Sequence, residues 1–117
     1  MTNRIDRVNS LIQEELGKIV LKDVELPSNT LATITGVKTS VDLANASVYV
    51  SVIPQGMAKR VVEILNKIIY GLQQSLNGKL KMRPVPKIRF MEERQADKAA
   101  RIEELLEDVK GDIQEGL

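Results

Sequence analysis

Eight of the seventeen basic residues of this chain fall within residues 59–89, where the only acid is Glu63. These eight are Lys59, Arg60, Lys67, Lys79, Lys81, Arg83, Lys87 and Arg89. The stretch has a formal balance of +7, whereas residues 1–58 carry five basic and six acidic residues (−1) and residues 90–117 carry four and nine (−5). Lysine and arginine neutralise phosphates and release counterions, so such a cluster is typical of a surface that binds a nucleic-acid backbone. The net charge of +1 therefore conceals a polarised molecule.

Two interpretations of this basic segment stay open from the residues alone. The cations could bind RNA, or they could form a solvated face that pairs with the acidic C-terminal stretch. If RNA is bound, contacts to phosphates and to shape are favoured over base stacking, because Tyr49, Tyr70 and Phe90 are the only aromatic residues. Of these, Phe90 is expected in the core. A second class of function is a protein-interaction module, in which the acidic C-terminal helix docks a partner.

Catalytic chemistry finds little support in this sequence. The chain has no Cys and no His, which excludes disulfides, Cys/His zinc sites and thiol or imidazole catalysis. The segment from Gly71 to Lys79 is not a phosphate-binding loop, because Leu80 stands where that loop needs Ser or Thr. Paired acids such as Glu103 and Glu104 are adjacent, and adjacent helical residues do not face each other. We expect no enzymatic activity, no metal and no cofactor.

The composition indicates one folded domain. Hydrophobic residues make up 43% of the 117 and aromatic residues only 3%, which predicts an aliphatic core. The polar N-terminus does not resemble a signal peptide, and no apolar run approaches the roughly 18 to 20 residues of a membrane span. We expect a cytoplasmic monomer that does not bind membranes, with a main domain over residues 1–93 and an acidic amphipathic helix over residues 94–117.

Hydrophobic spacing predicts a helix and two strands in the first half of the chain. A helix is predicted over residues 3–21, with its apolar side chains at helical spacing: Ile5, Val8, Leu11, Ile12, Leu16, Ile19 and Val20. Strands are predicted over residues 31–39 and 45–53. The second alternates, with Ala46, Val48, Val50 and Val52 on one side. The short link at residues 40–44 favours antiparallel pairing of these strands.

The second half of the chain predicts a long helix, a strand and a last helix. One apolar stripe runs through Met57, Val61, Ile64, Leu65, Ile68, Leu72, Leu76 and Leu80. Gly71 lies within this stripe, and we expect either a kink there or close helix packing. Pro84 and Pro86 lead into a strand at about residues 87–91. The last helix follows from Arg94, with a stripe of Ile102, Leu105, Leu106, Val109 and Ile113 beside an acidic side.

This order predicts an α+β, type II KH-like domain with a three-stranded sheet and helices on one face. Three stretches are distinctive: Arg7-Val8-Asn9-Ser10-Leu11-Ile12, Asp42-Leu43-Ala44-Asn45-Ala46-Ser47-Val48-Tyr49-Val50-Ser51-Val52 and Leu80-Lys81-Met82-Arg83-Pro84-Val85-Pro86-Lys87-Ile88-Arg89-Phe90. Together they resemble the ribosome-binding factor A family over roughly residues 3–93. The chain contains no Gly-x-x-Gly, and Ile69-Tyr70-Gly71 stands where the family has an Ala-x-Gly kink.

The resemblance implies a non-enzymatic assembly factor that binds the small (30S) ribosomal subunit and its 16S rRNA during late maturation and rRNA processing. It also implies RNA contacts by Gly71, Gln73 and Gln74 in addition to the eight cations of residues 59–89. Members usually have an Arg where this chain has Gln73 and Gln74, so contacts just beyond Gly71 are expected to be weaker. The acidic helix is a candidate for contacting a basic ribosomal protein. A generic KH-like RNA-binding protein remains an alternative.

Overall fold

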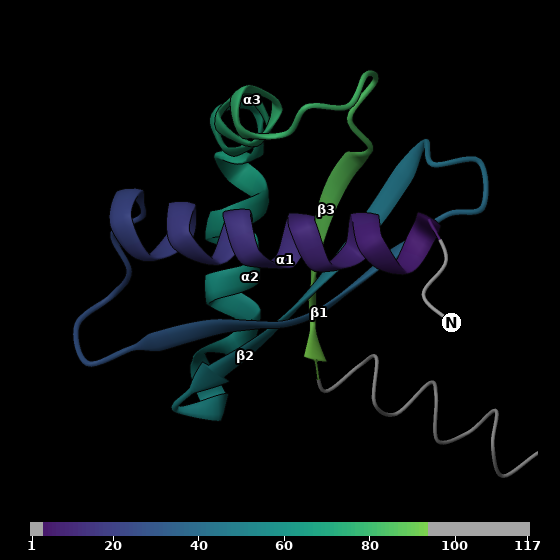
Figure 1. Cartoon of the computed structure of the whole chain (residues 1–117). Helices are drawn as coiled ribbons and strands as arrows, with labels where there is room; N and C mark the ends of the chain where they lie inside the picture. Colours follow the sequence, from purple (N-terminus) through teal and green to yellow (C-terminus); the bar gives the residue numbers. More distant parts are fainter. Residues whose placement is uncertain (1–3, 94–117) are drawn as a thin grey trace, which may run out of the picture.

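The computed structural model describes residues 4–93, which form three helices over a three-stranded sheet (Figure 1). In chain order the elements are α1 (Arg4–Asp23), β1 (Leu31–Thr39), β2 (Asn45–Ile53), the short 3-10 turn η1 (Gln55–Met57), α2 (Ala58–Lys67), α3 (Ile69–Lys79) and β3 (Lys87–Glu92). The order matches the one that the sequence predicted. The predicted helix over residues 94–117 lies outside the described residues.

The sheet has the order β1-β2-β3, with β1 and β2 antiparallel and β2 and β3 parallel. A short loop over residues 40–44 joins β1 to β2, as predicted. The carbonyl of Ala44 in this loop accepts a hydrogen bond from the Lys87 N–H at 2.9 Å, where β3 begins. The hairpin loop therefore sets the position at which β3 joins the sheet.

A bulge at Thr35 interrupts the β1–β2 ladder. Ile34 pairs with Val50 while Gly36 pairs with Tyr49, so Thr35 has no partner across the ladder. Since side chains alternate along a strand, the extra residue exchanges the two faces of β1. Ile34 points into the core before the bulge, and Val37 takes the inward position opposite Val48 after it.

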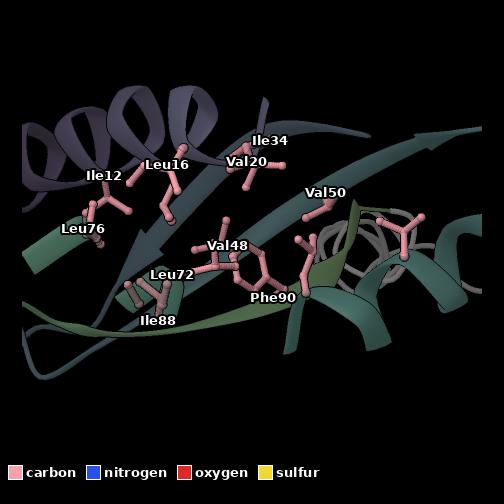
Figure 2. Packing of buried hydrophobic residues seen from close by; sticks show 14 of the residues in the cluster. Ile12, Leu16, Val20, Ile34, Val48, Val50, Leu72, Leu76, Ile88 and Phe90 are labelled. Carbon is pink, nitrogen blue, oxygen red and sulfur yellow. The ribbon is translucent and has the colours of Figure 1, made fainter. Parts of the chain in front are cut away.

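The core lies between the sheet and the helices. All three helices and all three strands contribute buried aliphatic side chains to this core. Phe90 is the only buried aromatic residue of the core within residues 4–93. Figure 2 shows Ile12 of α1 pointing toward Leu76 of α3, and Leu16 of α1 pointing toward Val48 of β2. The inward residues of β2 (Ala46, Val48, Val50 and Val52) are buried, whereas the outward residues in the middle of that strand are half-buried. The helices therefore cover one face of the sheet, and the expected core position of Phe90 is confirmed.

The long predicted helix breaks at Ile68, three residues before the expected position at Gly71. Ile68 leaves helical geometry (φ −104°, ψ 20°), and Figure 1 shows α3 turned nearly end-on above α2. Ile68 is 41% exposed, so its predicted place in the core stripe is wrong. Gly71 lies inside α3, with nothing within 4 Å of where a Cβ would stand. Neither a kink at Gly71 nor close helix packing against it is therefore observed.

Local sequence and tertiary contacts both favour the break at Ile68. Ile68 and Ile69 are β-branched, which lowers helix propensity slightly. Asn66 and Gln73, on either side of the break, both hydrogen-bond to β3. In a straight helix these residues would be about 10.5 Å apart along the axis. Their partners on the strand, two residues apart, are separated by only about 6.6 Å. The bend brings both amides to the same strand edge.

Candidate RNA-binding surface

The eight cations of residues 59–89 are all exposed. The salt bridges within residues 4–93 are those of Lys18 with Glu14 and Glu15 on α1, at 3.6 and 3.9 Å. None of the eight cations is therefore neutralised by an acid of the described part of the chain. Unpaired surface cations are available to bind an anionic partner without first breaking a protein salt bridge.

The fold separates these cations into three locations. Lys59 and Arg60 lie in the first turn of α2, and Lys67 ends that helix at the break. Lys87 and Arg89 point outward from β3. Lys79, Lys81 and Arg83 follow one another at the end of α3 and in the loop beyond it.

A groove crosses the β3 edge at the helix break and encloses about 550 Å³. Its lining residues come from β2, the helix break and β3: Asn45, Ala46, Ser47, Asn66, Ile69, Lys87, Ile88 and Arg89. Asn45 pairs with Lys87 and Ser47 pairs with Arg89, so these four side chains share the outer face of the sheet. The groove therefore combines two cations with neutral hydrogen-bonding groups.

Two amide side chains attach the helices to the free edge of β3. Asn66 donates through Nδ2 to the Phe90 carbonyl and accepts from the Phe90 N–H through Oδ1, both at 3.0 Å. Gln73 donates through Nε2 to the Pro86 carbonyl at 3.0 Å and accepts from the Ile88 N–H at 2.9 Å. The amides thus replace a neighbouring strand along this edge and fix one wall of the groove.

The two glutamines beyond the break differ in environment. The Gln73 amide is bonded to β3 and also donates to Asn77 Oδ1 at 3.1 Å, whereas Gln74 is exposed. The structural role of Gln73 was not predicted from the sequence. The sequence feature that could have indicated this role is a polar residue, Gln73, directly beside the core stripe residues Leu72 and Leu76.

Arg83 and Lys79 stand apart from the groove. The Arg83 guanidinium donates through Nη1 to the carbonyls of Leu80 (3.0 Å) and Met82 (2.6 Å), which ties down the loop after α3. Its remaining N–H donors are still available to a ligand. Lys79 lines a different depression, between α3 and the second half of α1, together with Glu15 and Asp23. The basic segment is therefore not one continuous patch.

Two further residues that sequence reasoning did not include lie around the groove. Tyr70 is 76% exposed in the first turn of α3, directly after the exposed Ile68 and groove-lining Ile69. Lys38 of β1 pairs with Ser47, which pairs in turn with Arg89, so one row across the sheet ends in a cation on each side. Strict alternation along β1 would not place Lys38 on the outer face, because the bulge at Thr35 shifts by one residue which side chains point inward.

The hairpin loop beside the groove is ordered by Asp42. Its Oδ1 accepts from Ser40 Oγ at 2.6 Å and from the Ala44 N–H at 3.0 Å. These hydrogen bonds, the one from Ser40 first, lower the pKa of the Asp42 carboxyl below its ordinary value. The ionised carboxylate thus supports the loop that presents the Ala44 carbonyl to β3.

The described residues show neither a membrane-spanning helix nor a metal-binding cluster. No helix within residues 4–93 is long and apolar enough to cross a bilayer. In the same range no three acidic side chains gather in a way that could hold a metal ion.

The element order, the mixed sheet and the broken helix pair define an α+β domain with the order of a type II KH domain. The family model described as ribosome-binding factor A matches residues 4–106. A ribosome-binding factor A from Chlorobaculum parvum is 40% identical over 114 residues, covering 94% of this chain and 93% of that protein. One from Pseudomonas paraeruginosa is 33% identical over 108 residues, covering 90% and 84%. The chain belongs to the ribosome-binding factor A family.

Solved structures of the family share the fold. The crystal structure of ribosome-binding factor A from Thermus thermophilus matches with a TM-score of 0.61 at 23% identity, over 79% of this chain and 99% of that one. A Thermus thermophilus model fitted into the cryo-EM map of a 30S–ribosome-binding factor A complex matches with a TM-score of 0.58 at 24% identity, over 71% and 88%.

Proposed function

We propose that this protein binds the small ribosomal subunit through its 16S rRNA and acts in the cytoplasm, as a monomer and without catalysis, during late subunit maturation and rRNA processing. The observation that carries the proposal is the groove at the helix break, where Lys87 and Arg89 stand without an acidic partner in the described residues. Membership of a family named for ribosome binding supports it, and so does the 30S complex of the Thermus thermophilus relative.

In this proposal, contacts to the rRNA backbone dominate. Lys87 and Arg89 line the groove and Lys67 ends α2 at the break, while Lys59 and Arg60 extend the basic surface along α2. Gly71 is exposed in the first turn of α3 with open space beside it, so a phosphate can approach the backbone N–H groups of that turn. Gln74 adds a neutral donor, and Gln73 contributes by holding the groove wall. Lys79, Lys81 and Arg83 form a second contact region at the far end of α3.

The main domain, residues 1–93, carries these contacts, and residues 94–117 form a separate acidic unit in this proposal. Residues 94–117 contain seven acidic and four basic residues, so they are not expected to bind rRNA phosphates.

The test is sedimentation of the full chain with purified small subunits, and with large subunits as the control, at several salt concentrations. We expect preferential association with small subunits and a steep fall of log affinity with log salt. Equal association with both subunits, or affinity for small subunits that salt does not change, would contradict the proposal. The second outcome would favour a protein-interaction module.

A further inference from the structure

The outer face of the sheet is not covered by any element of residues 4–93. The helices contribute to a core on the opposite face, and the outward side chains in the middle of β2 are only half-buried. Leu31 and Ile53 pair across β1 and β2 on this outer face, and they are 52% and 64% exposed. These two adjacent aliphatic side chains form an apolar end on a face that residues 4–93 leave open.

This outer face changes character along the strands. Leu31 and Ile53 mark an apolar end, and Tyr49 with Met91 forms a half-buried row in the middle. The row of Lys38, Ser47 and Arg89 follows, with Lys87 beyond it, and none of these cations has an acidic partner among the described residues. A partner that covers the whole face therefore needs apolar side chains for the end with Leu31 and Ile53 and negative charge for the end with the cations.

The end of the chain has that chemistry and begins close by. Glu93, the last described residue, follows the end of β3 and lines a small pocket with Ser51 of β2 and with Gln55 and Ala58, so the chain continues from the margin of the sheet. Residues 102–117 carry six acids and one lysine, a balance of −5. Their apolar residues repeat at helical spacing: Ile102, Leu105, Leu106, Val109 and Ile113. The intervening residues 94–101 can span up to about 26 Å, enough to reach any part of the sheet.

We propose that residues 102–117 dock on the outer face of the sheet. The apolar stripe of the segment covers Leu31, Ile53 and Tyr49, and its acids lie toward Lys38 and Arg89. An apolar groove of about 210 Å³ between α1 and β1 is the competing location, and its lining also includes Leu31. Its lining contains no cation, so the six acids would gain no partner there. Charge complementarity therefore favours the outer face.

The outer face and the groove share two cations. Arg89 and Lys87 belong both to the outer face and to the groove at the helix break. Acids of the segment and phosphates of rRNA then compete for the same two cations. This consequence rests on the proposed function, whereas the docking itself does not.

The docking can be tested by paramagnetic broadening, because the chain has no Cys. A nitroxide is attached to the full chain through Glu107→Cys, and broadening of backbone amide signals is measured. Docking on the outer face predicts the strongest broadening in β2 and β3, at Ser47, Tyr49 and Arg89. Broadening in α1 should be weaker, because α1 lies behind the opposite face of the sheet. Strongest broadening at Gly17 and Leu21 of α1 would place the segment in the apolar groove and overturn the proposal. Uniformly weak broadening would also overturn it.

Two controls make the result specific. Lys38→Glu should reduce the broadening, whereas Lys22→Glu on the exposed side of α1 should leave it unchanged; equal effects of the two variants would contradict the charge pairing. Mixing spin-labelled chains with isotope-labelled chains that carry no nitroxide must give no broadening, since broadening there would assign the contact to a second copy. No ribosome is present, so failure of the docking and failure of the proposed function are distinguished.

Discussion

Asn66 and Phe90 exchange two hydrogen bonds across 24 residues of sequence, side-chain amide to backbone, each at 3.0 Å. An asparagine amide presents one donor and one acceptor side by side, as a peptide group in a neighbouring strand would. Gln73 makes the equivalent pair of bonds to Pro86 and Ile88 on the other side of the break. The angle between α2 and α3 is therefore fixed by β3 as well as by the local chain.

Gln73 and Gln74 offer a matched test of this edge contact. Gln73→Ala removes the partners of the Pro86 carbonyl and the Ile88 N–H and should destabilise the protein by about 1–3 kcal/mol. Gln74→Ala makes the same change at an exposed position and should cost no more than about 0.5 kcal/mol. Urea unfolding followed by circular dichroism measures both. Equal effects would show that the edge bonds do not contribute to stability.

Leu65 and Ile68 test the break in the core stripe. Leu65 is fully buried, so Leu65→Ala should destabilise the protein by about 2–5 kcal/mol. Ile68→Ala should have a much smaller effect, because Ile68 is 41% exposed. Thermal unfolding of the two variants gives the comparison. A continuous helix with Ile68 in the core would make the two effects similar.

Gly71→Ala should stabilise the protein. Gly71 has a negative φ inside α3, and the added Cβ would have nothing within 4 Å. Alanine is favoured over glycine in a helix by about 1 kcal/mol, and the unfolded chain also loses entropy. Chemical denaturation measures the change, and Gly78→Ala near the end of α3 is a control in similarly open space. A destabilised Gly71→Ala would mean that this position needs a glycine-specific backbone.

The groove cations should matter more for rRNA binding than the cations after α3. Replacing the groove cations Lys87 and Arg89, together with Lys67 at the helix break, by Gln should weaken small-subunit binding. It should also lower the salt slope by about one unit for each phosphate that is no longer neutralised. Replacing Lys79, Lys81 and Arg83 together with Gln should weaken it less, because none of these three residues lines the groove. Affinities at several salt concentrations, with circular dichroism to verify folding, give both slopes.

A matched charge control replaces Glu103, Glu104 and Glu107 with Gln. This change should leave small-subunit binding unchanged or strengthen it. Parental affinity and slope in both cation triple variants would show that the basic segment is only a solvated surface.

Asp42 should make the free energy of unfolding depend on pH in the acidic range, where its carboxyl group titrates. Its pKa is lower in the folded protein than in the unfolded chain, so the carboxylate stabilises the fold above the unfolded value of about 4. That contribution disappears as the pH falls through the lowered folded pKa. Carbon-detected NMR of the carboxyl should show the low midpoint, and Ser40→Ala should raise it because the Ser40 hydrogen bond is its largest cause. An unchanged midpoint in Ser40→Ala would contradict this assignment.

The sequence predicted those parts of the fold in which hydrophobic residues repeat with one regular spacing. Strand β2 alternates strictly, so Val48 and its inward neighbours were placed correctly on the core side. Ile68 was misplaced because its pattern continues the stripe, while the break is favoured by contacts of Asn66 and Gln73 with a strand that lies far along the chain. Such contacts leave no periodic signal. Likewise, the sequence showed how many cations cluster but not that the fold divides them among three locations.

The edge contacts of Asn66 and Gln73 also affect how copies of this protein meet. An open strand edge is a template for adding another strand, and the amides occupy that template along β3. The other edge strand, β1, carries the bulge at Thr35 and the exposed Lys38, two features that hinder strand addition. Both edges of the small sheet are thus protected against edge-to-edge aggregation, even though residues 4–93 leave one of its faces uncovered.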